Sequence, residues 1–201
     1  MAKRSFPPLY VPSGDLDTDR LAFFHVLERL KTQKRTGWID HNVLNPESIS
    51  DHMYRMAILA MCTSDATLDV PKCVMMCVVH DLAEAQVGDI TPREGISKEE
   101  KRRLEAEAMH NFVHDMLHAS PAALRIEALY KEYEEGMTPE AKFVKGTYST
   151  GVDADVSSRE YEKAHARDRG DLQGFFDSSL PYLRHPEVRH WGDTLASERD
   201  E

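Results

Sequence analysis

The chain has 201 residues, 41% of them hydrophobic and 30% charged, which is enough for one domain with a hydrophobic core and typical of a globular protein. Its 35 acidic against 25 basic residues give a formal net charge of −10, a balance that repels polyanions and argues against a nucleic-acid groove. No apolar run approaches the roughly 18 residues that a membrane-spanning helix needs. No apolar stretch follows the basic residues near the N-terminus, so we expect no signal peptide.

The first elements are an arm and two helices. Residues 1–17 predict an extended arm, because their three prolines resist helix formation. Residues 17–33 place apolar side chains along one helical face, and we expect this helix to end at Gly37. A loop follows, and Ser48 or Ser50 can cap the next helix, SDHMYRMAILAMC.

The middle of the chain continues the helical pattern. Pro71 begins VPKCVMMCVVHDLAEAQ, which is apolar almost all round and therefore predicts a central helix that breaks at Gly88. Residues 97–100 have the Ser-x-x-Glu spacing of a capping box and precede a long amphipathic helix, whose run of mixed charges indicates a solvated face. Two Ser-Pro or Thr-Pro pairs, at Pro121 and Pro139, begin two further helices.

The sequence therefore predicts an all-α fold, a single helical bundle over residues 18–185. Within it, residues 146–158 are rich in Gly, Ser, Thr and β-branched residues and predict a poor helix. Residues 186–201 predict a polar tail that frays.

The three cysteines indicate a reducing compartment. Three thiols cannot form a closed set of disulfides, and Cys73 and Cys77 lie four residues apart among apolar neighbours. This spacing favours a buried helical face over metal ligation. We therefore expect a cytoplasmic protein.

The chemistry is concentrated around His80 and Asp81, near the end of the most apolar helix. An ionisable pair in so buried a context is costly unless a partner such as a divalent metal compensates it. Glu84 and Asp89 follow closely and can converge on the same helix end. His52, in another helix, supplies a third candidate ligand. Two imidazoles and a carboxylate suit Mn, Co, Fe, Ni or Zn.

Three segments identify a resemblance. The runs ESISDHMYRMA, VVHDLAEAQVGDITP and KEEKRRLEAEAM strongly resemble the HD-domain phosphohydrolases, and in particular their 5′-deoxynucleotidase group. The likeness covers about Leu21 to Val144, resumes at Glu160 and weakens towards His185. It implies hydrolysis of deoxyribonucleoside 5′-monophosphates to the nucleoside and phosphate. It also implies a homodimer and activation by a divalent cation such as Mn, Co or Mg.

By position, the resemblance implies that His52, His80 and Asp81 bind the metal. Glu84 and Asp89 match an acidic pair that serves the catalytic water or a second cation. A metal in an N/O site acidifies water and polarises a phosphate oxygen. Glu84 or Asp89 can then orient that water or protonate the leaving 5′-oxygen.

Two further residues are candidates for binding the substrate. Arg35, in the KRTGW segment, matches the family's arginine before a tryptophan and can clamp a phosphate bidentately; the alternative is a solvated loop arginine. Trp38 can pack against the sugar and help exclude a 2′-hydroxyl; the alternative is a core anchor. Arg55, one turn after His52, is a weaker phosphate candidate.

The likeness breaks after KFVK, where the family places an aspartate that completes the metal site. Here Lys145 is followed by GTYSTGVDADVSS. Without a gap, Tyr148 takes the aspartate's place; with an insertion, Asp153 or Asp155 becomes the candidate for the fourth metal ligand. If no carboxylate reaches the metal, we expect weaker metal affinity and lower activity.

Other functions stay open beside the 5′-deoxynucleotidase. One is an HD phosphohydrolase with another nucleotide substrate, such as a triphosphate or a cyclic nucleotide. Another is a catalytically impaired HD-fold protein that binds a nucleotide or a partner, which the altered segment favours and the intact acidic pair disfavours. A purely structural metal protein fits poorly, because such a site is usually closed and cysteine-rich.

Overall fold

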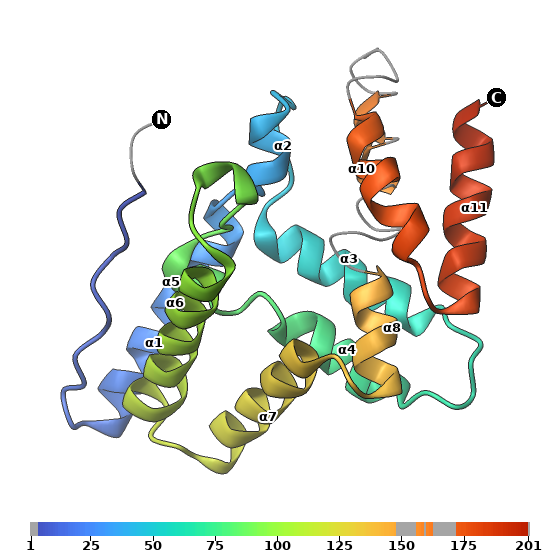
Figure 1. Ribbon diagram of the computed structural model, residues 1–201. Coiled ribbons are helices and arrows are strands. Elements are labelled where there is room, and N and C mark those ends of the chain that lie inside the picture. The colour runs from blue at the N-terminus through green and yellow to red at the C-terminus, as the bar shows by residue number, and fades with distance from the viewer. Residues whose placement is uncertain (1–3, 148–155, 159, 163–171, 201) are drawn as a thin grey trace. The chain divides into compact units, whose positions relative to one another are not determined.

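The computed structural model describes residues 4–147, 156–158, 160–162 and 172–200. Every regular element in these ranges is a helix, and the one β-type pairing among these residues is an isolated bridge between Lys34 and Ser48. The predicted all-α fold class is therefore confirmed (Figure 1). None of the helices in these ranges is long and apolar enough to cross a membrane.

The chain divides into two compact units, Met1–Asp51 with Val79–Tyr130 and His52–Val78 with Lys131–Glu201. The helices that fall mainly in the first unit are α1 (Leu16–Thr32), α2 (Thr36–Asp40), α5 (Glu84–Val87), η1 (Pro92–Glu94), α6 (Lys98–His110), the π-helical η2 (Asn111–Met116) and α7 (Pro121–Glu135). Those mainly in the second unit are α3 (Ile49–Met61), α4 (Val70–Val79), α8 (Pro139–Thr147), α10 (Gln173–Ser179), η4 (Leu180–Tyr182) and α11 (Pro186–Asp200).

Local capping explains where several helices begin. The Ser48 hydroxyl accepts a hydrogen bond from the Asp51 backbone N–H at 3.1 Å, and the Asp51 carboxylate accepts one from the Ser48 N–H at 2.8 Å. Of the two predicted caps for α3, Ser48 is thus the one used. Ser97 accepts from the Glu100 N–H at 3.1 Å, whereas the Glu100 carboxylate pairs with Arg103. Both Pro-initiated helices, α7 and α8, begin at the expected proline.

The first helix ends earlier than predicted. Its C-terminal cap is Gln33, with an extended backbone (φ −76°, ψ 132°), and Gly37 lies inside α2 instead. The strand-like pairing explains the stop: the Arg35 N–H donates to the Glu47 carbonyl at 3.1 Å, and the Ile49 N–H donates to the Gln33 carbonyl at 3.2 Å. These long-range hydrogen bonds replace the next helical turn, which no local sequence signal reveals.

The expected central helix is interrupted at its functional end. α4 stops at Val79, and a tight turn follows in which Leu82 N–H donates to the Val79 carbonyl and Glu84 N–H to the Asp81 carbonyl, each at 3.0 Å. These bonds span three residues rather than four, so the backbone is wound more tightly than an α-helix. The predicted break at Gly88 is confirmed, since this residue ends α5 with φ of +74°.

In the first unit, α1, α5, α6 and η2 pack around a common core (Figure 1). The rings of Phe23 and Phe112 meet edge to face, with their centroids 5.6 Å apart. Residues 4–15 of the N-terminal arm lie outside any helix and are held along this core by hydrogen bonds. The amide of Gln86 donates to the Pro7 carbonyl at 2.7 Å, and the backbone of Tyr10 exchanges two hydrogen bonds with the side chain of Asn111.

The second unit has its own core, to which α4 and α8 contribute. Cys73 and Cys77 are fully buried in it, so the interpretation of these thiols as small core side chains is confirmed. Burial raises the pKa of the Cys73 thiol to about 11. Cys62 is exposed and forms no disulfide.

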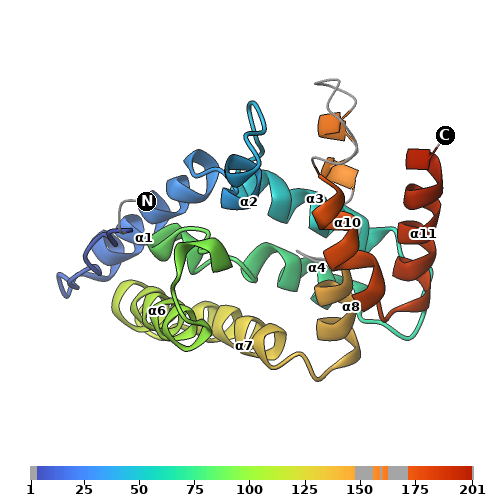
Figure 2. The same cartoon turned by 45° about the horizontal axis from the view of Figure 1, so that its top comes forward.

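The C-terminal segment differs from the frayed tail that we expected. Residues 186–200 form α11, which lies against α8 and η4 (Figures 1 and 2). Val188 is fully buried, and Trp191 packs against the core of this unit. The Glu187 carboxylate accepts hydrogen bonds from the Ser64 N–H at 3.0 Å and from the Thr63 hydroxyl. A composition that is polar overall thus conceals one apolar face.

Candidate metal centre

Three side chains with metal-binding atoms come together in the chain. His52 lies in the first turn of α3, and His80 and Asp81 lie in the tight turn after α4. All three are buried, and one ligand atom from each lies within 4.8 Å of the others. The structure therefore gathers the histidines and the aspartate that the sequence singled out, although they are 28 residues apart along the chain.

The donor set of this cluster fits a divalent cation. The Nε2 atom of His80 lies 3.2 Å from Oδ2 of Asp81, and Nη1 of Arg35 lies 3.4 Å from the same oxygen. Two imidazoles with one carboxylate form a mixed N/O set of intermediate softness, which suits Mn, Co, Fe, Ni or Zn. Burial of all three groups makes a compensating cation more valuable, because water does not solvate them.

Glu84 adds a second carboxyl group to the same region. Its side chain is 2% exposed, and its Oε2 atom has no hydrogen-bond partner among the described residues. Burial raises the pKa of Glu84 well above its usual range, and the negative charges of Asp81 and Asp89 raise it further, against the opposing charges of Arg35 and Lys101. A carboxyl in this position favours either a proton or a nearby cation.

Asp89 is held by the start of α2. Its Oδ2 atom accepts a hydrogen bond from the Thr36 N–H at 2.7 Å, and its backbone carbonyl accepts one from the Thr36 hydroxyl at 2.7 Å. The side chain is partly exposed, unlike that of Glu84. The two acids of the predicted pair therefore occupy different surroundings.

Arg35 and Trp38, the two candidates for binding the substrate, lie in different surroundings. The Arg35 side chain is only 12% exposed and faces Asp81, so it is not a solvated loop arginine. Trp38 is 2% exposed, and its indole N–H donates to Oε1 of Glu47 at 2.9 Å, which fits the core-anchor interpretation. Contacts of either side chain with a nucleotide stay predictions.

The remaining candidates are Arg55 and the residues after the break at Lys145. Arg55 donates a hydrogen bond to the hydroxyl of Ser157, so at least one of its N–H groups is already engaged. Tyr148, Asp153 and Asp155 lie outside the residues that the structure describes. The fourth metal ligand therefore stays a prediction.

Lys101 is a charged neighbour of the site that sequence reasoning missed. Its Nζ donates to the Ile90 carbonyl at 3.2 Å and lies 3.5 Å from a Glu105 oxygen. Although burial opposes it, the carboxylates of Glu105 and Glu84 raise the pKa of Lys101 above its usual value, with smaller contributions from Asp81 and Asp89. The expected solvated face of α6 holds only in part at this position, because the Lys101 side chain is 33% exposed. Lys101 shares a helical face with Glu105, Ala108 and Phe112, and only the burial of these residues in the structure shows that this face is packed.

The comparison with known protein families agrees with this arrangement. The family model for the HD domain matches residues 27–176, and the chain belongs to this family. The resemblance found in the sequence is thereby confirmed.

Individual relatives narrow the comparison. The 5′-deoxynucleotidase hdd1 of Schizosaccharomyces pombe is 42% identical over 89% of this chain and 89% of its own length. The human 5′-deoxynucleotidase HDDC2 is 42% identical over 93% of this chain and 89% of its own length. Among solved structures, the PH0347 protein of Pyrococcus horikoshii superimposes with a TM-score of 0.67 at 27% identity, covering 90% of this chain and 98% of its own.

Proposed function

We propose that this protein is a metal-dependent 5′-deoxynucleotidase, a phosphoric monoester hydrolase that converts deoxyribonucleoside 5′-monophosphates to the deoxynucleoside and phosphate. The observation that carries the proposal is the buried cluster of His52, His80 and Asp81, whose ligand atoms lie within 4.8 Å of one another. The activity named for hdd1 and HDDC2, each 42% identical to this chain, supports the choice of reaction.

In this proposal His52, His80 and Asp81 hold a divalent cation, with Mn, Co or Mg as the candidates. Glu84 and Asp89 serve the catalytic water or a second cation. The bound cation supplies Lewis-acid polarisation of the phosphate and makes water a better nucleophile near neutral pH.

The protein's own groups divide the remaining work. The Glu84 carboxyl, with its raised pKa, retains a proton that it can give to the 5′-oxygen as the bond from phosphorus to that oxygen breaks. Asp89, held by Thr36, orients the attacking water. Arg35 is placed beside Asp81 and can donate two parallel N–H groups to the phosphate. Trp38 shapes the sugar end of the site.

The fourth metal ligand is assigned to Asp153, with Asp155 as the alternative. Asp153→Asn or Asp155→Asn should weaken metal binding by about 10- to 100-fold, a loss typical of ligand and supporting groups at metal sites. Calorimetric titration with Mn measures this directly. Unchanged affinity in both variants would remove the segment from the site.

The first experiment is phosphate release from dAMP and AMP by metal-stripped protein, with and without added Co or Mn. Release that requires the cation and favours dAMP is the expected result. Pyrophosphate from a deoxynucleoside triphosphate, or hydrolysis of a cyclic nucleotide, would favour another HD phosphohydrolase activity. A folded protein that binds Mn and cleaves none of these would favour the impaired HD-fold binding protein.

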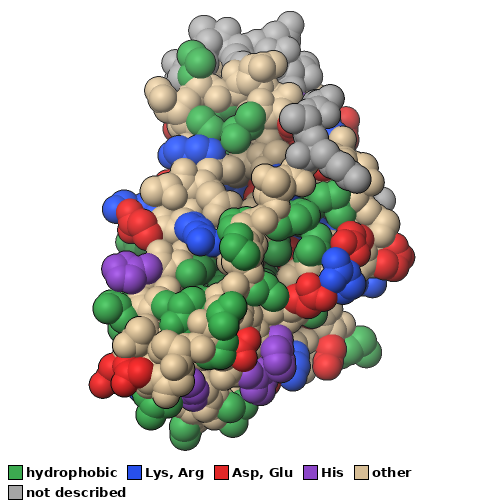
Figure 3. Space-filling model, turned by 90° about the vertical axis from the view of Figure 1, so that its left-hand side faces the viewer, with side chains coloured by type: hydrophobic (Ala, Val, Ile, Leu, Met, Phe, Trp, Pro, Cys, Tyr) green, Lys and Arg blue, Asp and Glu red, His purple; other side chains and the backbone are tan. Residues whose placement is uncertain are grey.

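We further propose that the enzyme acts in the cytoplasm as a homodimer and does not bind nucleic acid. The three cysteines without disulfides support a reducing compartment. On the face seen in Figure 3, the described Lys and Arg side chains are scattered among Asp and Glu rather than joined in a stripe. Light scattering measures the oligomeric state. A titration with single-stranded DNA at low salt tests whether the protein binds nucleic acid.

A further inference from the structure

A guanidinium group from the N-terminal arm sits on the turn that carries Asp89. Nη1 of Arg4 donates to the Val87 carbonyl at 3.2 Å, and Nη2 donates to the Asp89 carbonyl at 2.8 Å. Nε and Nη2 also reach the two carboxylate oxygens of Glu94, each at 2.5 Å. One side chain therefore joins both sides of the turn at Gly88 to the end of η1.

The turn is shaped to receive this group. A Cβ atom at Gly88 would lie 2.2 Å from Nη1 of Arg4 and 3.1 Å from Oε1 of Gln33, and the φ of +74° is one that side-chain-bearing residues rarely adopt. Gly88 was predicted as a helix break. The structure adds a second reason for glycine here, because only a residue without a side chain lets the guanidinium lie against the backbone.

Hydrogen bonds along the N-terminal arm fix the position of Arg4 at the Gly88 turn. The carbonyls of Pro7 and Pro8 accept hydrogen bonds from the Gln86 amide at 2.7 and 3.2 Å, and Tyr10 is paired with Asn111. Gln86 is in turn oriented by Arg29, whose Nη1 donates to its Oε1 at 3.0 Å. The arm is thus anchored on α5, immediately before the Gly88 turn.

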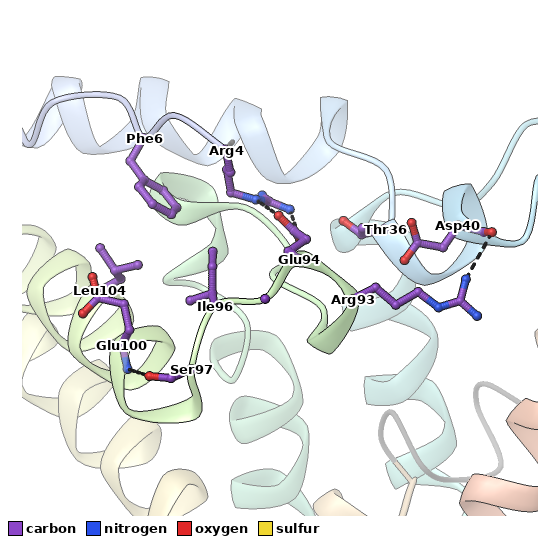
Figure 4. Close-up of a pocket in the computed structure, with 11 residues that line it drawn as sticks. Arg4, Phe6, Thr36, Asp40, Arg93, Glu94, Ile96, Ser97, Glu100 and Leu104 are labelled. Atoms are coloured by element: carbon purple, nitrogen blue, oxygen red, sulfur yellow. Dashed lines mark hydrogen bonds and ion pairs between the residues drawn. The ribbon is translucent and has the colours of Figure 1, made fainter. Parts of the chain in front are cut away.

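The same carbonyl of Asp89 receives donors from two sides. Arg4 approaches it from the arm, and the Thr36 hydroxyl approaches it at 2.7 Å from the start of α2, while the Thr36 N–H holds the carboxylate. Figure 4 shows Arg4 and Glu94 pointing toward one another beside Thr36, at the edge of a cavity of about 640 Å³. Arg4 contacts only backbone oxygens of the turn, so it acts on Asp89 through the main chain.

We propose that Arg4 is a positioning residue, which fixes the backbone of the Gly88 turn and thereby the carboxylate of Asp89 in the active site. This inference rests on the role given to Asp89 in the proposed function. Loss of the guanidinium removes four hydrogen bonds, two to backbone carbonyls and two to the Glu94 carboxylate, and frees the turn to move. A carboxylate displaced by a fraction of an ångström orients water poorly, which affects the chemical step more than substrate binding.

The test compares Arg4→Ala and Arg4→Lys with Arg20→Ala, which removes an exposed arginine whose ion pair with Asp17 lies on the surface of α1. We expect Arg4→Ala to lower kcat for dAMP by about 10-fold or more, with KM and Mn affinity changed less than about twofold. Arg4→Lys should recover little, because an ammonium does not bridge Glu94 and two carbonyls in one plane. Arg20→Ala should match the wild type. An unchanged kcat in Arg4→Ala, or an equal loss in Arg20→Ala, would overturn the proposal.

A double variant separates positioning from general stability. Gly88→Ala should lower kcat by displacing Arg4, and adding Arg4→Ala should then cost less than the product of the two single losses. Strictly multiplicative losses would contradict a shared contact.

Hydrogen exchange provides a readout that does not need an active enzyme. In metal-free protein, amides of residues 87–91 should exchange faster in Arg4→Ala than in wild type, while amides of α7 stay unchanged. If wild-type protein releases no phosphate from dAMP, the proposed function fails. In that case faster exchange would still support Arg4 as the clamp of the turn, and unchanged exchange would overturn it.

Discussion

Replacing Glu84 by glutamine should raise the stability of the metal-free protein and lower its activity with metal. The Glu84 carboxyl is 2% exposed, has a buried oxygen without a hydrogen-bond partner among the described residues, and lies near the carboxylates of Asp81 and Asp89. A buried polar atom left unsatisfied costs about 1–3 kcal/mol. Glutamine is nearly isosteric, carries no charge and offers an N–H donor to the neighbouring acids. We therefore expect Glu84→Gln to raise the free energy of unfolding of metal-free protein by about 1–3 kcal/mol.

The pH dependence of this gain has a definite sign. The pKa of Glu84 is raised in the folded protein above its ordinary value of 4.5, so the folded protein binds this proton more tightly than the unfolded chain does. The associated stability is fully present below pH 4.5 and is lost as the pH rises through the raised pKa. The advantage of Glu84→Gln over wild type should therefore be small at pH 4.5 and larger at alkaline pH.

Urea unfolding in the presence of a chelator measures the stability, and phosphate release from dAMP with Mn measures the activity. We expect the activity of Glu84→Gln to fall by about 100-fold or more, the usual contribution of a general acid. Glu107→Gln is the matched control, because Glu107 is exposed and pairs with Arg103 on the surface of α6. Its stability should stay within about 0.5 kcal/mol of wild type. A Glu84→Gln protein that is less stable than wild type without metal, or equally active with it, would refute this account of the site.

Three further predictions concern groups away from the metal ligands. A thiol reagent at pH 8 should label only Cys62 rapidly, because the two cysteines of α4 are buried; rapid reaction of more than one thiol per folded chain would contradict the core assignment. Trp38→Phe should lower the free energy of unfolding by about 1–3 kcal/mol, since Glu47 loses its buried indole donor. Calorimetry at neutral pH measures this change, and an unchanged stability would contradict the prediction. Hydrogen bonds from Thr67 lower the pKa of Asp65 to about 2, so stability should fall as the pH drops from 3.8 toward 2, and a pH series on Asp65→Asn should lack that part of the slope.

The local signals in the sequence located most helices. Prolines at the start of α7 and α8, Ser48 before α3 and Ser97 before α6 all act within one helical turn, so their effect does not depend on the rest of the fold. The end of α1 was misplaced because hydrogen bonds to Glu47 and Ile49 decide it. Those partners lie in a later segment, which local propensity does not detect.

In the candidate site, too, the sequence indicates the residues and long-range contacts decide their surroundings. Residue type and setting sufficed to select His52, His80 and Asp81, because ionisable groups within apolar helices require a compensating partner. Their convergence within 4.8 Å depends on the packing of the helices that carry them. Lys101 was assigned to a solvated face, since its neighbours are charged, and only the burial of Glu105 and Phe112 shows that this face points inward.

The sequence by itself determined the helical class and the choice of the candidate metal ligands and the acids beside them, because composition, period and charge are properties of the chain alone. The tertiary structure decided that Glu84 is buried and Asp89 partly exposed, and it brought Arg4 from the N-terminal arm onto the turn before Asp89. Contacts between residues more than 80 positions apart have no signature in spacing, so the surroundings of each group, and with them its pKa and orientation, follow only from the folded chain.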